Sequence, residues 1–353
     1  MSSFQILDTS NFVYTAANFW HPTMQIPLNW ISCFTNISTL RTNKNIRDIA
    51  HEYSIHTAEI ESITPCPSID QVVVGKVLTA VRHPESTKLW ICTVQIDQTG
   101  STETILTGAP NVYAGMYTPT ALVGCQIAPD FVIGERKMVG MISRGMMCGA
   151  DEIGVTRTTA AGIMDLLMDY SESELEAHIG KSFYILGAPF LSPDNTIMRI
   201  PFVDQVLEID NKNMTNRPDL FGIIGHAREF AALYRTGLDQ SRVRSTPATL
   251  TNWQSSPEVL VEVQTPNVRS YNLATLSGVT PARTPLGIMM MLERCGLTSH
   301  DAIVDMTNYV MMEYGQPMHA FDADTIEGHI IVRQARTGET LITLDGKERS
   351  LVV

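Results

Sequence analysis

The stretch from Ile303 to Asp322 contains a single histidine, His319, close to its end; its sequence is IVDMTNYVMMEYGQPMHAFD. An imidazole side chain can transfer a proton near neutral pH. The spacing predicts a β-like run over 302–304 and then an amphipathic helix, with Asp305 as its N-cap and Gly315 as its left-handed C-cap. A proline two residues before the histidine stops the helix and stiffens the loop. The residues alone fit two interpretations. One is a histidine presented for chemistry, and the other is a helix that fills a core and carries a histidine in an ordinary polar contact.

Other reactive patterns fail on spacing or are missing. His51-Glu52 and His56 resemble the zinc-protease pattern H-E-x-x-H, but a step of five residues at about 100° each places the histidines roughly 140° apart on a helix. The six cysteines form no C-x-x-C pair, which predicts neither a zinc site nor a disulfide framework. No G-x-G-x-x-G or G-x-x-x-x-G-K-[ST] is present, so nucleotide cradles of those types are excluded.

The composition of the chain is that of a globular protein without a membrane span. A length of 353 residues allows two or three domains, and the net charge of −12 argues against broad non-specific nucleic-acid binding. Recognition of RNA by shape or stacking is still compatible with that charge. The longest apolar run, Leu286 to Leu292, is too short for a bilayer, and the first twenty residues lack the layout of a signal peptide. We expect a cytoplasmic protein with neither membrane nor DNA as a partner.

Residues 72–155 are predicted to form a small closed barrel, because short β runs alternate with glycine turns and no long helix intervenes. Strands are expected over 72–80, 89–97 and 117–123. Alternation predicts a buried face in the second strand, made of Trp90, Cys92, Val94 and Ile96. The segment has six basic and seven acidic residues, a net charge of −1, and therefore no electrostatic funnel. Two interpretations stay open, a purely structural barrel or a tRNA contact through Lys88, Arg136, Lys137 and Arg144.

The rest of the chain alternates short helices and strands. A strand is predicted over 206–209 and a helix from Asp219 to Tyr234, in which Gly222 and Gly225 imply a close packing partner. Arg217 fits either a phosphate contact or, more simply, a salt bridge within the fold. Further along we expect a helix over 286–295, a tight turn at Asp345-Gly346, and strands over 261–263, 272–278, 329–334, 341–344 and 348–353.

Several strings of the sequence resemble one enzyme family. D-x-T-N-Y-V-x-x-E-x-G-Q-P-M-H-A-F-D is similar to the editing-domain signature in the β subunit of bacterial phenylalanyl-tRNA synthetase. MQIPLNWISCF, T-N-R-P-D-L and the barrel strings VVVGKV, HPESTKL, TGAPNV and SRGMMCGADEIG resemble the same subunit. The resemblance covers roughly residues 24–353 and implies an α+β, multidomain architecture. The expected parts are an N-terminal extension (1–23), a discontinuous α/β domain (24–68 and 158–239), an oligonucleotide-binding barrel (70–157), a linker (240–258) and part of an editing domain (259–353).

The resemblance also implies an activity and partners. Such β subunits join an α subunit in an (αβ)2 enzyme that attaches phenylalanine to tRNA(Phe) with ATP and magnesium. Because the α subunit holds the aminoacylation site, no cofactor and no metal are expected on this chain. The β subunit hydrolyses tyrosine mis-attached to the same tRNA, since an apolar pocket cannot strongly reject an isostere that adds only a hydroxyl group.

Residue by residue, the resemblance assigns roles in the hydrolytic site. Asn308 would contact the backbone of the amino acid, Thr307 would shape the pocket, and His319 would position the tRNA terminus or the attacking water. Thr298 stands where the family commonly has arginine, so a charged contact to the tRNA end is lost or supplied elsewhere. The family's editing glutamate lies beyond Val353, and the chain reads as cut in mid-sheet, so we expect this chain alone to be inactive in editing. The alternative functions are a free-standing tRNA-binding protein and, less favoured, a free-standing editing hydrolase.

Overall fold

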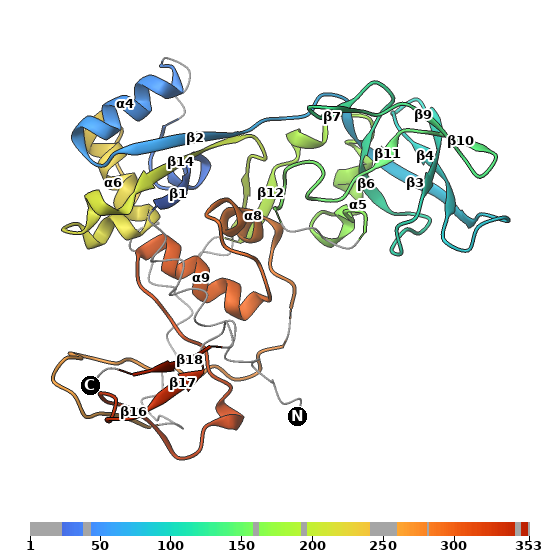
Figure 1. The fold of residues 1–353 in the computed structure, drawn as a ribbon. Coiled ribbons are helices and arrows are strands. Elements are labelled where there is room, and N and C mark those ends of the chain that lie inside the picture. The colour runs from blue at the N-terminus through green and yellow to red at the C-terminus, as the bar shows by residue number, and fades with distance from the viewer. Residues whose placement is uncertain are drawn as a thin grey trace.

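The computed structural model describes residues 23–37, 44–157, 162–191, 196–240, 260–280, 282–342 and 347–351. The predicted extension up to residue 22, the linker after Gln240 and the predicted turn at Asp345-Gly346 lie outside these residues. Figure 1 shows a barrel at the right, a small α/β unit at the upper left and the C-terminal strands at the bottom, with helix α9 between them. The α+β, multidomain architecture predicted from the sequence is confirmed.

The α/β unit is built on a three-stranded antiparallel sheet with the order β1-β14-β2. Its strands are β1 (Thr23–Pro27), β14 (Asp204–Asp210) and β2 (Ile60–Cys66), and its helices are α2 (Leu28–Ile31), α4 (Ile46–His56) and α6 (Ile223–Tyr234). Asn45 caps α4 by accepting a hydrogen bond from the Arg47 amide. Helices α4 and α6 are joined by a hydrogen bond of 2.6 Å between the Tyr53 hydroxyl and Nδ1 of His226. Burial lowers the pKa of His226 to about 3, so this core histidine is neutral.

Helix α6 begins at Ile223, and the prediction that Asp219 opens it is wrong. Pro218–Phe221 form the separate 3-10 turn η5, and Gly222 follows with an extended backbone, φ −128° and ψ 148°. Arg217 joins the turn η5 to helix α6, because its guanidinium contacts Asp219 of η5 at 2.9 Å and Glu229 of α6 at 2.6 Å. The salt-bridge interpretation of Arg217 is therefore confirmed. The Arg217 guanidinium also lowers the pKa of the Asp219 carboxyl group.

The barrel is nearly closed, as the glycine-punctuated strands predicted. Its main sheet has the order β11-β6-β3-β4-β5, and β7 to β10 form two hairpins beside it. The Leu106 amide on β5, an edge strand of the main sheet, donates to the Ser143 hydroxyl on β10 at 3.0 Å and so links that edge to the β9–β10 hairpin. The Cys92 and Val94 side chains are fully buried, in agreement with the predicted alternation. The strands are β3 (Val72–Arg82), β4 (Trp90–Gln95), β5 (Thr102–Thr107), β6 (Tyr117–Ala121), β7 (Gln126–Ala128), β8 (Phe131–Val132), β9 (Glu135–Met138), β10 (Met141–Arg144) and β11 (Met146–Met147).

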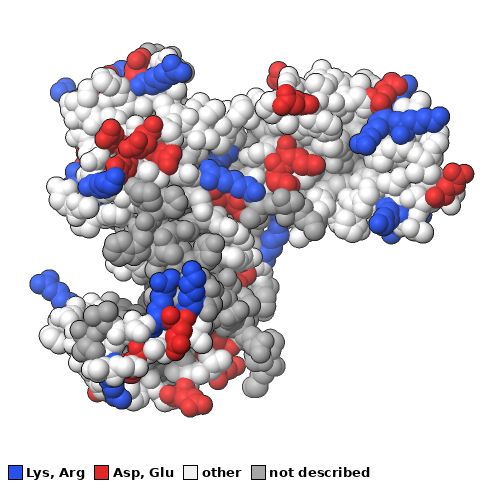
Figure 2. Space-filling model, viewed as in Figure 1, with Lys and Arg blue, Asp and Glu red and all other residues white. Residues whose placement is uncertain are grey.

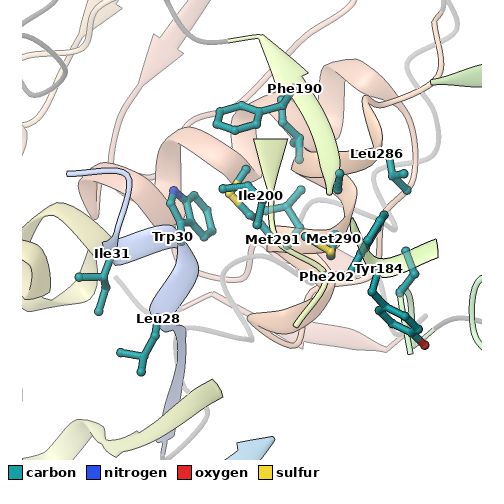
Figure 3. Close-up of a cluster of buried hydrophobic side chains, with 14 of the residues drawn as sticks. Leu28, Trp30, Ile31, Tyr184, Phe190, Ile200, Phe202, Leu286, Met290 and Met291 are labelled. Atoms are coloured by element: carbon teal, nitrogen blue, oxygen red, sulfur yellow. The ribbon is translucent and has the colours of Figure 1, made fainter. Parts of the chain in front are cut away.

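Between barrel and sheet, short elements complete the core. They are η2 (Leu166–Met168), α5 (Glu172–Glu176), η3 (Phe183–Ile185), β12 (Ala188–Leu191) and β13 (Ile197–Ile200), and the 3-10 turn η4 (Asn211–Met214) follows β14. Helix α8 (Leu286–Arg294) packs on β12, and Figure 3 shows its Met290 and Met291 beside Ile200 and near Trp30 of α2. One continuous core thus joins the sheet, part of the barrel and the helices that follow the predicted linker. The predicted domain boundaries stay a prediction.

Helix α9 runs from Ala302 to Tyr314, and two details of its start differ from the prediction. Residues 302–304 form its first turn and are not a β run. Asp301 is the N-cap, because its carboxylate accepts from the amides of Ile303 and Val304, whereas Asp305 is buried inside the helix. The predicted end is confirmed, since Gly315 adopts the left-handed conformation with φ 74°.

The C-terminal strands form two separate pairs. Strand β15 (Leu260–Val263) runs parallel to β16 (His329–Val332), and β17 (Thr340–Ile342) is antiparallel to β18 (Glu348–Ser350). The 3-10 turn η7 (Ala323–Thr325) lies before β16. The strand predicted over 272–278 is wrong, because these residues pair with no strand in the described part of the chain and are mostly exposed. Among the described residues, no helix is long and apolar enough to cross a bilayer.

Candidate functional site

Helix α9 and its two flanks carry the four residues predicted for hydrolysis. Asn308 is 3% exposed and lies on the buried face of α9, where its side chain makes no hydrogen bond within the described residues. The Thr307 hydroxyl donates to the Val304 carbonyl oxygen at 2.7 Å. His319 is exposed on the segment after α9, and its ring lies 6.2 Å from the half-exposed ring of Phe321. Thr298 is exposed on the loop between α8 and α9. The unit is therefore one helix with an accessible loop at either end.

Asp305 fixes the loop that precedes α9. Its buried carboxylate accepts from the hydroxyls of Thr284 and Ser299, both at 2.5 Å, and from the His300 amide at 3.0 Å. Three donors from two separate segments thus meet on one side chain, and the loop with Thr298 is held against the first turn of α9. Sequence reasoning missed this role by treating Asp305 as the cap. The signal that was available is the second aspartate, Asp301, four residues earlier.

The barrel carries the second candidate site, a groove of about 800 Å³ at the seam between β5 and the hairpin of β9 and β10. Of the four predicted basic residues, only Arg136 lines this groove. On the hairpin Lys137 lies opposite Ile142 and Arg144 opposite Glu135, with which Arg144 forms an exposed ion pair at 3.2 Å. Side chains of adjacent residues in a strand point to opposite faces. Lys137 therefore points away from the groove side that Arg136 occupies. Lys88 is exposed, with its backbone next to Gly108 at the groove rim.

The electrostatics of the groove do not attract phosphate strongly. Glu135, Asp151 and Glu152 line it together with Arg136, and many of the remaining lining residues are glycine or apolar. Figure 2 shows basic and acidic side chains interspersed over the barrel, with no continuous basic patch on the visible face. A cation–aromatic pair that sequence reasoning missed lies on β3 and β4, where Arg82 sits 3.9 Å from the centroid of the Trp90 ring. The groove can offer shape and aromatic or apolar contacts more readily than charge.

The described residues hold no group of three or more His, Cys, Asp or Glu side chains arranged for a metal ion. The six cysteines are all free thiols, and burial raises the pKa of Cys148 to about 12.

Comparisons with known proteins connect both sites to one family. Residues 72–169 match the putative tRNA binding domain family, and residues 267–352 match the B3/4 domain family. Over 332 residues the chain is 34% identical to the phenylalanine–tRNA ligase beta subunit of Xanthomonas euvesicatoria, an alignment that covers 93% of this chain and 37% of that protein. Over most of its length the chain is therefore similar to phenylalanine–tRNA ligase beta subunits.

Two further phenylalanine–tRNA ligase beta subunits are similar to the chain to about the same degree. The Pseudomonas fluorescens protein is 35% identical over 294 residues, which cover 83% of this chain and 34% of that protein. The Streptococcus pneumoniae protein is 32% identical over 307 residues, which cover 86% of this chain and 36% of that protein. The chain thus spans about a third of the length of these curated relatives. The barrel groove lies within the tRNA-binding match, and α9 with His319 lies within the B3/4 match.

Proposed function

We propose that the chain acts as part of the β subunit of a phenylalanine–tRNA ligase. In this role it contributes to tRNA(Phe) binding, to assembly with an α subunit in an (αβ)2 enzyme, and to part of the site that hydrolyses mis-charged tyrosyl-tRNA(Phe). ATP and magnesium serve aminoacylation in the holoenzyme, which works in the cytoplasm, and this chain binds neither. The observation that best supports the proposal is that one similarity, 34% identity over 93% of the chain, runs through both the barrel and the α9 unit. A free-standing tRNA-binding protein is not favoured, because the B3/4 match follows the barrel.

In the proposed hydrolysis, the α9 unit holds the aminoacyl end of the tRNA. Asn308 contacts the amino-acid backbone with its amide, and no side-chain hydrogen bond within the described residues competes for that group. Thr307 acts by shape, since its hydroxyl is engaged by Val304. The exposed His319 positions the tRNA terminus or the attacking water, and at the other end of α9 the Asp305 carboxylate holds the loop that carries Thr298.

The tRNA-binding part of the proposal makes a prediction about one face of the barrel hairpin. Arg136→Ala should weaken tRNA(Phe) binding, because Arg136 is the basic residue that lines the groove. If its guanidinium contacts one phosphate, the slope of log K against log salt should fall by about 0.7–0.9. Filter binding of tRNA(Phe) to this chain over a salt series measures the slope.

Lys137→Ala is the matched control, since it removes the same charge from the neighbouring position on the opposite face of the hairpin. Its salt slope should stay that of the unmodified chain. Equal slopes for Arg136→Ala and the unmodified chain would mean that Arg136 makes no phosphate contact.

The hydrolytic part predicts a loss of editing when the histidine is removed. In a holoenzyme that contains this β subunit, His319→Ala should slow the release of tyrosine from tyrosyl-tRNA(Phe), by about 10²-fold if the imidazole acts on the water. His56→Ala, which removes an exposed histidine on α4, is the control and should leave the rate unchanged. Undiminished release by His319→Ala would exclude the proposed role, and release by this chain alone that is abolished by His319→Ala would make it a hydrolase in its own right.

A further inference from the structure

A second, smaller cavity lies where the sheet meets the helices α8 and α9. Its volume is about 260 Å³, and we call it the joint cavity. The lining comes from β1, from the region of η4 and η5, from the end of α8 and from α9. It consists of Thr23, Met24, Gln25, Arg157, Asn211, Phe221, Cys295, Gly296, Leu297, Met311 and Met312. None of the residues predicted for hydrolysis or tRNA binding is among them.

Among the described residues that line the cavity, Arg157 is the one with a charged side chain. Its backbone amide donates to the Glu293 carboxylate and its Nη1 donates to Oε1 of Gln25, both at 2.8 Å, so the residue is held at two points. Within the described residues the other guanidinium nitrogens have no hydrogen-bond partner. Arg157 is also exposed, which leaves those donors accessible from solvent. At one end of the joint cavity the Arg157 guanidinium thus provides a positive charge in a fixed position, with N–H donors that a ligand can use.

The carboxylates near the joint cavity are already engaged. The Glu208 carboxylate accepts from the hydroxyls of Thr23 and Ser62 at 2.7 and 2.6 Å. Glu293 accepts from the amides of Arg157 and Ser299, at 2.8 and 3.4 Å. Neither carboxylate belongs to the lining. The described lining therefore presents a positive charge to a ligand and no carboxylate.

The rest of the joint cavity is apolar and adaptable. Met24, Leu297, Met311 and Met312 are each at most 8% exposed, and unbranched methionine side chains adjust to the shape of a ligand. Burial raises the pKa of the Cys295 thiol well above its ordinary value, so the thiol is neutral. An apolar body with one charged end is the combination that such a lining can bury without leaving a charge unpaired.

We infer that the joint cavity binds a small carboxylate with a short apolar or aromatic body. The carboxylate pairs with Arg157, and the body lies among Met24, Met311 and Met312. This site does not depend on the proposed editing or tRNA-binding roles, because it shares no residue with either. A ligand there would touch the sheet and α9 at once and would stabilise the junction of the two.

Methyl-¹³C-methionine NMR on this chain tests the inference with 3-phenylpropionate as the probe. Saturable shifts of the Met311 and Met312 methyl resonances are expected at millimolar probe, with assignments made from Met→Leu variants. Phenethylamine, which has the same ring and the opposite charge, should produce none. Arg157→Gln should weaken binding of 3-phenylpropionate at least about ten-fold, whereas Arg157→Lys should retain most of it.

Three outcomes would overturn the inference. They are no saturable shift of these methyl resonances, equal shifts with phenethylamine, or undiminished binding by Arg157→Gln. The methyl resonance of Met290, which lies in the core on α8 and outside the lining, reports whether each variant is folded. If Arg157→Gln does not fold, the comparison of the two oppositely charged probes on the unmodified chain decides the result.

Discussion

Arg294→Ala is expected to lower the free energy of unfolding by about 3–5 kcal/mol, because it leaves a buried carboxylate without its cation. Arg294 at the end of α8 contacts Asp204 on β14 at 3.0 Å, and the two side chains are 5% and 0% exposed. The guanidinium also donates to the Phe202 carbonyl oxygen. After the substitution, Asp204 would still accept from the amides of Asn29 at 3.0 Å and Gln205 at 2.8 Å, but it would lack the guanidinium charge. Urea unfolding followed by circular dichroism measures the loss.

An exposed ion pair on the barrel provides the control for this prediction. Arg144 and Glu135 lie 3.2 Å apart with half of each side chain exposed, so Arg144→Ala should cost less than about 1 kcal/mol. The double variant Arg294→Met/Asp204→Asn should recover part of the loss, since no uncompensated charge stays buried. Equal losses for Arg294→Ala and Arg144→Ala would show that the buried pair does not hold α8 to the sheet.

Gly222→Ala is expected to destabilise the chain by about 1–3 kcal/mol or more, through a backbone clash between α6 and α9. A Cβ atom at Gly222 would lie 2.5 Å from the Gly315 nitrogen and 2.6 Å from the Tyr314 carbonyl carbon. Because both are backbone atoms, no side-chain rotation can relieve the contact, and one of the two helix ends must move. The shift in the urea midpoint, compared with that of the unmodified chain, measures the effect.

Gly134 is a suitable reference position. Its φ is not in the left-handed region, and a Cβ atom there meets nothing within 4 Å, so Gly134→Ala should change stability by less than about 0.5 kcal/mol. If Gly222→Ala were equally mild, the close approach of Gly222 and Gly315 would have to be absent in solution.

The sequence patterns correctly predicted those parts of the fold that depend on interactions between residues close in sequence. The buried alternation of Cys92 and Val94, and the end of α9 at Gly315, follow from residues close in sequence. The start of α9 was predicted wrongly, because two aspartates four residues apart can both cap a helix. Donors from Thr284 and Ser299 bury Asp305, and this leaves the capping position to Asp301. A long-range contact is also present at the start of α6, because Gly222, directly before the helix, lies against the distant Gly315.

In the candidate sites, too, features set by nearby residues could be predicted from the sequence, and features set by tertiary packing could not. The residue spacing predicted a helix that includes Asn308 and a loop after it that carries His319, and the structure places them there. The roles that the family resemblance assigns to them stay a prediction. The resemblance could not tell Arg136 from Lys137, because their orientation depends on the register of the β9–β10 hairpin. Nor could any motif reveal the joint cavity, since Arg157, Gln25 and Met311 come from distant segments that meet only after packing.

The parallel pairing of β15 with β16 restricts how the C-terminal strands can turn. Leu260 and His329 are partners in register, yet the chain between them travels into the core through α8 and α9 before it returns. The strand pair is therefore attached to the rest of the molecule through separate connections on either side of the docked helices. A domain attached by one flexible connection can rotate about it as a hinge. Where several chain connections join the same two parts, all of them must deform together for the parts to rotate. Rotation of the segment bearing His319 relative to the barrel is thus resisted by the path of the chain itself, in addition to the contacts at its surface.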